Sequence, residues 1–140
     1  MILVVAIVDG PLTQSADAAA RLDMQSELDR ATRGGGIGAS LRFEGIVRRM
    51  EEGRELIALD YRTYDPMAER ELRSLARAVA ERHGLSSIVA LHSRGRVDVG
   101  EVSFVLQVEA PHRREALAAV TDFIDRLKQD VPIWKQPVWA

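Results

Sequence analysis

The chain has 140 residues, 46% of them hydrophobic and 29% charged, which is typical of one globular domain with a substantial core. Its net charge of −2 lacks the basic excess that nucleic-acid-binding proteins normally show. It contains no cysteine, which excludes disulfides, thiolate metal sites and a cysteine nucleophile. Any sulfur chemistry would therefore need sulfur delivered by another molecule.

The first third of the chain predicts a strand and a helix. Residues 2–8 form a continuous Ile/Val/Leu run typical of a buried strand. This run lacks a basic leader and is too short for a signal peptide or a membrane span, so we expect a cytoplasmic protein. Residues 15–32 are Ala-rich and predict a helix, in which Ala18, Leu22 and Leu28 share an apolar stripe. Residues 34–36 are three glycines, and with no Lys-Ser/Thr after them they indicate a linker rather than a phosphate loop.

The middle of the chain predicts a hairpin followed by a helix. Residues 37–47 alternate as a half-buried strand does, residues 51–53 form a turn, and residues 56–64 return as an antiparallel second strand. Asp65 and Pro66 then suit the cap and first position of a helix. Gly84 closes this helix, whose apolar stripe consists of Ala68, Leu72, Leu75, Ala76 and Val79.

The last third predicts two more strands and a final helix. Residues 87–92 and 102–109 are the strands, with a turn region at Gly95 and Gly100 between them. The last helix begins near Pro111, ends before Pro132 and presents an apolar stripe of Leu117, Val120, Ile124 and Leu127. The predicted order is β-α-β-β-α-β-β-α. It indicates a single α+β domain over residues 1–140, with an antiparallel or mixed sheet packed by helices on one side.

The distribution of lysine is unusual. Of 19 Lys plus Arg residues, two are lysines, Lys128 and Lys135, seven positions apart around a Pro-Ile-Trp segment. A lysine loses its proton more readily than an arginine and so can act as a neutral amine. Chance placement is the alternative.

Other basic residues suggest an anion site. His112, Arg113 and Arg114 lie in the first turn of the last helix, where free backbone amides already favour anions; a solvated basic turn beside Glu115 is the alternative. Arg48 and Arg49 follow a strand end and can pair with Glu51 and Glu52 at a hairpin rim. His92 reads as a structural histidine. The three histidines have no metal-ligand spacing, so we expect no metal and no bound cofactor.

The two ends of the last helix are too far apart to serve one small ligand. From Arg113 to Lys128 the helix spans about 22 Å at about 1.5 Å per residue. If both ends contribute to one pocket, two copies of the chain must bring them together.

Several segments together resemble the large, catalytic subunit of molybdopterin synthase. They are residues 38–48 (GASLRFEGIVR), 59–68 (LDYRTYDPMA), 92–101 (HSRGRVDVGE), 110–113 (APHR) and 123–135 (FIDRLKQDVPIWK). Each motif is weak alone, but their order and spacing make the set specific from about Gly38 to Lys135. The resemblance implies an α/β hammerhead-type fold.

The resemblance also implies a sulfurtransferase of molybdenum cofactor biosynthesis. In that family a ubiquitin-like small subunit with a C-terminal Gly-Gly thiocarboxylate delivers the sulfur. Two sulfurs convert cyclic pyranopterin monophosphate into molybdopterin. The assembly is a homodimer of large subunits with a small subunit at each end, a heterotetramer. Neither nucleic acid nor membrane takes part.

Carried over by position, the resemblance makes Lys128 and Lys135 the catalytic lysines. Lys128 would act as acid, base or charge stabiliser near the partner's carbonyl, and Lys135 would hold phosphate or developing negative charge. The substrate-binding positions would be Arg48, His112 and Arg113, the latter two from the neighbouring subunit, with Phe43 and Ile124 as pocket walls.

The chain departs from the family at three places. Ser93 follows His92 where the family has arginine, and Arg94 is displaced by one position. After Lys135, residues 136–140 (QPVWA) replace an acidic residue and a basic tail. The Ala-rich first helix and residues 34–36 also differ from the family's shorter entry. The different C-terminus keeps open the alternative of a non-catalytic relative that binds a Gly-Gly tail or a phosphorylated ligand. A structural dimer with an incidental basic groove is a further alternative.

Overall fold

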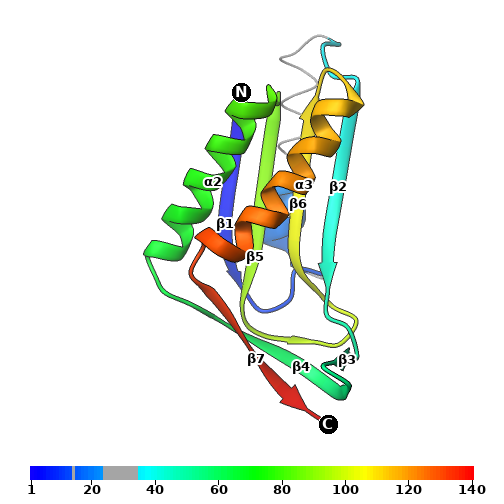
Figure 1. Cartoon of the computed structure of the whole chain (residues 1–140), viewed down its shortest axis with the longest axis vertical. Helices are drawn as coiled ribbons and strands as arrows, with labels where there is room; N and C mark the ends of the chain where they lie inside the picture. The colour runs from blue at the N-terminus through cyan, green and yellow to red at the C-terminus, as the bar shows by residue number, and fades with distance from the viewer. Residues whose placement is uncertain (14, 24–34) are drawn as a thin grey trace.

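The computed structural model of the chain describes residues 1–13, 15–23 and 35–140 (Figure 1). Two long helices are present in these ranges, α2 (Met67–His83) and α3 (Arg113–Asp130), and residues 16–23 are also helical. The strands are β1 (Ile2–Asp9), β2 (Ala39–Ile46), β3 (Met50–Glu51), β4 (Arg54–Thr63), β5 (Ser87–Asp98), β6 (Val102–Ala110) and β7 (Ile133–Trp139). The predicted α+β class is confirmed, with β3 and β7 as unpredicted additions.

The strands form a mixed sheet in the order β2-β6-β5-β4-β3. β1 runs parallel to the first part of β5, and β7 pairs antiparallel with β4. Gly95, with φ 89°, lies where β5 leaves β1 and begins to pair with β4. The β4–β7 ribbon consequently lies across the lower end of the larger sheet (Figure 1). The predicted pairing of residues 37–47 with residues 56–64 is wrong, because β2 pairs with β6 and β3 is the strand that pairs with the start of β4.

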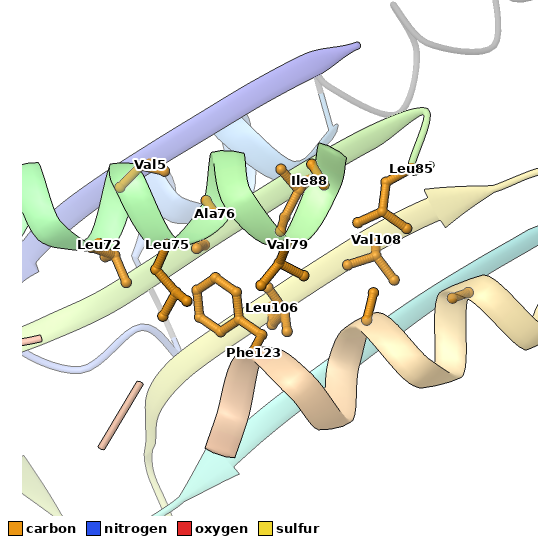
Figure 2. Close-up of a cluster of buried hydrophobic side chains, with 14 of the residues drawn as sticks. Val5, Leu72, Leu75, Ala76, Val79, Leu85, Ile88, Leu106, Val108 and Phe123 are labelled. Atoms are coloured by element: carbon orange, nitrogen blue, oxygen red, sulfur yellow. The ribbon is translucent and has the colours of Figure 1, made fainter. Parts of the chain in front are cut away.

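The main core lies between the sheet and the two long helices (Figure 2). Phe123 of α3 is fully buried, and its ring stacks on that of Phe104 of β6 with centroids 5.9 Å apart. The predicted stripe of α2 is confirmed, since all five residues are buried. The other face of the sheet is covered by residues 16–23, where Ala18 and Leu22 pack in a second cluster with Val89, Leu91 and Val105. Helices therefore lie on both faces of the sheet, whereas the sequence analysis predicts them on one face only.

Two local predictions are wrong for physical reasons. On α3, Leu117 of the predicted stripe is 56% exposed, so the prediction is wrong at this position. The other three stripe residues, Val120, Ile124 and Leu127, are partly buried and pack against the main core, beside the fully buried Ala116, Ala119 and Phe123. Asp65 does not cap α2, which begins after Pro66 without a side-chain cap. Instead, Asp65 accepts hydrogen bonds from Thr63 and Arg94.

The helix ends otherwise follow their sequence signals. Gly84 closes α2 in the left-handed conformation with φ 65°, as predicted, because glycine adopts a positive φ without strain. Ser15 Oγ accepts a hydrogen bond from Ala18 N at the start of the first helix. Residues 24–32 of that predicted helix, with Leu28, and Gly34 of the linker lie outside the described residues. None of the helices in the described ranges is long and apolar enough to cross a membrane.

Candidate active site

One group of predicted site residues lies where α3 leads into β7. Lys128 is exposed in the last turn of α3, where a cation interacts favourably with the helix dipole. Ile124, one turn earlier, is partly buried and packs against the main core. Pro132 follows the end of the helix, as predicted, and Pro132 O accepts a hydrogen bond from Tyr64 N. The chain then continues directly as β7, which carries Lys135.

Lys135 is held beside the hairpin of β3 and β4. Pairing with β4 places Lys135 opposite Tyr61, and its Nζ lies 3.3 Å from Glu51 Oε1. The other oxygen of that carboxylate, Oε2, lies 3.7 Å from Nη2 of Arg48. Glu51 therefore connects two cations that are distant in sequence, both predicted as site residues.

The second group of predicted site residues lies at the opposite end of α3. His112 is the N-cap residue, with extended backbone (φ −137°, ψ 153°), and it makes no side-chain cap hydrogen bond. His112 Nδ1 lies 3.6 Å from Glu115 Oε2. An open hollow of about 560 Å³ is lined here by Gly38, Pro111, His112, Arg113, Arg114 and Glu115.

Glycine at position 38 allows the close approach that forms this hollow. Gly38 N donates to Ala110 O at 3.0 Å, and a Cβ at position 38 would collide with the carbonyl oxygen of Pro111. The hollow combines the free amides of a helix start with exposed cationic side chains, which is a suitable environment for an anionic group.

The structure thus brings Arg48 together with Lys135 but separates His112 and Arg113 from Lys128. Arg113 and Lys128 are the first and sixteenth residues of one continuous helix, about 22 Å apart along its axis. Within the described part of the chain, neither cation has a carboxylate within 4.0 Å. Both are therefore available to a negatively charged ligand.

Phe43 is an exposed apolar residue on an edge strand. It is 38% exposed on β2, and its ring centroid lies 6.2 Å from that of Phe104. β2 pairs with β6 at one end of the main path of the sheet. An exposed aromatic ring there can contact another molecule, as a pocket-wall role requires.

His92 and Arg94 have structural environments. His92 is buried between Tyr61 and Phe104, its Nδ1 lies 2.8 Å from Ser93 O, and burial lowers its pKa from 6.5 to about 4. The predicted structural role of His92 is thus confirmed. Arg94, the displaced arginine of the sequence motif, donates to Asp9 at 2.7 Å and Asp65 at 2.6 Å, and these contacts raise its pKa. The same contacts connect β1, β5 and the start of α2.

The contact between Glu51 and Lys135 was not predicted from the sequence. The sequence indicates Glu51 as a partner for Arg48 at a hairpin rim, and this pairing is present. The contact with Lys135 depends on β7, and Pro137 inside this segment argues against a strand. The strand tolerates Pro137 because β7 has β4 as its single partner strand in the described sheet.

Comparisons with known proteins agree with this fold and arrangement. The MoaE protein family matches residues 18–130. A molybdopterin synthase catalytic subunit from Drosophila willistoni is 41% identical over 105 residues, which are 74% of this chain and 28% of that protein. The chain spans 51% to 65% of the length of four further catalytic subunits.

Two solved structures share the fold. The molybdopterin synthase structure from Staphylococcus aureus is 28% identical, with a TM-score of 0.77 over 97% of this chain and 91% of that one. The complex of subunits 1 and 2 of molybdopterin-converting factor from Helicobacter pylori 26695 is 24% identical, with a TM-score of 0.72 over 100% and 90%. By the extent of the family match and the identity to the catalytic subunits, this chain belongs to the MoaE family.

Proposed function

We propose that the chain is the catalytic subunit of a molybdopterin synthase. It would convert cyclic pyranopterin monophosphate into molybdopterin with sulfur from a thiocarboxylated, ubiquitin-like small subunit. The observation that carries this proposal is that Arg48 and Lys135 meet at Glu51, with Lys135 on β7, the strand that follows the Lys128 end of α3 in the chain. Membership of the MoaE family supports the interpretation of these cations as parts of a sulfur-transfer site.

In this proposal the two lysines have different tasks. Lys128 is exposed, so its amine can approach the carbonyl carbon from which the partner's sulfur departs, as acid, base or charge stabiliser. Lys135 and Arg48 would hold the phosphate or the negative charge that develops during transfer. The absence of cysteine from the chain fits a reaction in which the partner supplies both sulfurs.

The proposed active site needs two copies of the chain. His112 and Arg113 lie about 22 Å from Lys128 along α3, too far for one small substrate to reach both in one chain. We therefore assign His112 and Arg113 to the site of the neighbouring subunit. Phe43 and Ile124, both with exposed surface, would form apolar walls of this shared pocket.

The proposed assembly is a heterotetramer of two such chains and two small subunits. It is supported by the existence of the same fold in the two-subunit Helicobacter pylori complex. The small subunit's Gly-Gly tail would reach Lys128, and the assembly would act in the cytoplasm, without nucleic acid or membrane.

Reconstitution with substrate and the thiocarboxylated small subunit, followed by measurement of dithiolene product, tests the proposal. We expect Lys128→Ala to lower turnover by at least about 100-fold, the usual minimum for loss of an acid-base group, while the variant still binds the small subunit. Gln129→Ala, the adjacent exposed residue, is the matched control and should retain turnover. Turnover by Lys128→Ala within a few-fold of the unsubstituted chain would contradict the assignment.

Lys128→Arg distinguishes the two possible tasks of Lys128. Arginine keeps the positive charge but does not release its proton at neutral pH. A Lys128→Arg variant that remains inactive indicates proton transfer by Lys128, whereas substantial recovery of turnover indicates charge stabilisation.

A further inference from the structure

Glu51 lies between two residues of the proposed active site. Its Oε1 accepts a hydrogen bond from Lys135 Nζ at 3.3 Å, and its Oε2 lies 3.7 Å from Arg48 Nη2. The Glu51 side chain is 22% exposed, compared with 53% for Lys135 and 78% for Arg48. The carboxylate is thus the most restricted member of the three, and the two cations are the members that face solvent.

The backbone around Glu51 determines where its carboxylate lies. Met50 and Glu51 form β3 and pair with Glu55 and Arg54 across the turn. The turn itself contains Glu52 at φ 51° and Gly53 at φ 77°. Leu56 N also donates to Arg49 O at 2.7 Å, which closes the hairpin behind the turn. Glu51 is therefore presented from a well-defined tight turn.

No acidic residue lies within four positions of Lys135 in the sequence. Residues 136–140 contain no acidic residue, and the nearest acidic residue before Lys135 is Asp130. The carboxylate that contacts Lys135 therefore comes from a distant segment, through the pairing of both β3 and β7 with β4. This arrangement also brings Arg48, which precedes β3, to the same carboxylate.

We propose that Glu51 is a positioning residue of the active site, one that orients Lys135 and Arg48 for the anionic substrate. This inference rests on the proposed function. A lysine ammonium has three donors, so the one used by Glu51 leaves two for the substrate, and arginine likewise keeps donors free. A flexible lysine side chain loses considerable rotamer freedom when it binds, and a carboxylate that already restrains it reduces this loss.

The role of Glu51 is in orientation rather than in stability. Exposed ion pairs contribute little to folding free energy, because solvent screens them and side-chain entropy opposes them. Removal of the Glu51 carboxylate should therefore leave the melting temperature nearly unchanged. A purely structural role would have the opposite signature, with lost stability and unchanged kinetics.

The presence of two lysines allows a direct test by NMR. Selective labelling of lysine side chains gives one signal each for Lys128 and Lys135, with Lys128 as the internal reference for a free side chain. We expect Lys135 to be less mobile than Lys128 in the unsubstituted protein. Glu51→Ala should make Lys135 as mobile as Lys128, and Glu52→Ala, at the neighbouring exposed carboxylate of the same turn, should leave both signals unchanged.

The kinetic arm uses the reconstituted synthase and the same variants. We expect Glu51→Ala to lower kcat/KM for cyclic pyranopterin monophosphate about 10-fold, mainly through KM, and Glu51→Gln, which keeps an acceptor oxygen, to recover part of this loss. Equal mobility of the two lysines before substitution, or a Glu51→Ala variant with unchanged kcat/KM, would overturn the proposal. If the unsubstituted chain shows no turnover, the proposed function fails, while the NMR arm still decides whether Glu51 restrains Lys135.

Discussion

The buried imidazole of His92 should make the stability of this protein fall between pH 7 and pH 5. His92 lies in an aromatic environment, with ring centroids 5.1 Å from Tyr61 and 5.7 Å from Phe104. Burial disfavours the charged imidazolium and lowers the pKa of His92 from 6.5 to about 4, although the hydrogen bond to Ser93 O opposes this effect. The folded protein therefore keeps His92 neutral in a range where the unfolded chain would protonate it.

The sign of the effect follows from this difference. Since the unfolded state binds the proton first as pH falls, the stability contribution is complete above pH 6.5 and is lost as pH falls towards 4. At 1.36 kcal/mol per pH unit, the whole difference corresponds to about 3 kcal/mol, and about 2 kcal/mol of it is lost between pH 7 and pH 5. The low pKa values of Asp9 and Asp65, caused by hydrogen bonds from Arg94 and Thr63 respectively, act at lower pH and leave this window unaffected.

Urea unfolding at pH 7 and pH 5 measures this loss directly. A His92→Gln variant, which cannot take up the proton, should lose stability overall but show a pH dependence about 2 kcal/mol weaker than the unsubstituted protein. If this variant does not fold, an NMR titration of the His92 ring gives the same information. Titration of His92 near pH 6.5 in the folded protein, or identical pH dependence in the variant, would refute the reasoning.

Four substitutions test the packing and backbone conclusions. Phe123→Ala should destabilise the protein by about 3–5 kcal/mol in urea unfolding, whereas Leu117→Ala should cost under about 1 kcal/mol, and the reverse order would contradict the burial of Phe123 and the exposure of Leu117. Gly38→Ala should destabilise the fold and weaken phosphate binding measured by calorimetry, because its Cβ collides with Pro111 O; an unchanged affinity would show that the hollow is not the anion site. Gly84→Ala should cost about 1 kcal/mol in the same unfolding assay, and a neutral result would argue against the left-handed cap.

The predicted helices show where sequence periodicity is sufficient and where it is ambiguous. The face of α2 follows from large apolar residues such as Leu72, Leu75 and Val79 at helical spacing. On α3 the predicted stripe is correct for Val120, Ile124 and Leu127, but it includes the exposed Leu117 and omits the buried Ala116 and Ala119, whose small side chains give a weaker apolar pattern than leucine does. Leu117 was assigned to the apolar stripe because of its hydrophobicity alone.

Strand partners are harder to predict than strands because pairing is not local. The alternation of residues 37–47 indicates a half-buried strand but carries no information about which strand lies beside it. The structure pairs this strand with β6, about sixty residues later in the chain, and not with the next strand in sequence. The misassigned hairpin and the missed β7 both have this cause.

The site shows the same division between local and distant information. Lys128 and Lys135 stand out by composition, and Arg48, His112 and Arg113 by resemblance and by charge at element ends. The opposite placement of the two groups on α3 follows from helix length. The contact between Glu51 and Lys135 could not be predicted, because it requires both β3 and β7 to pair with the same strand, β4.

The central claim, an active site shared between two copies of the chain, is tested most directly by mixing two inactive variants. Lys128→Ala and Arg113→Ala each remove one half of the proposed site, and each should be inactive alone in the dithiolene assay. In a mixed dimer, one of the two sites combines Lys128 of one chain with Arg113 of the other. Because half of the dimers formed by equal mixing are mixed, turnover should return to about a quarter of the unsubstituted level, whereas no recovery on mixing would contradict the shared site.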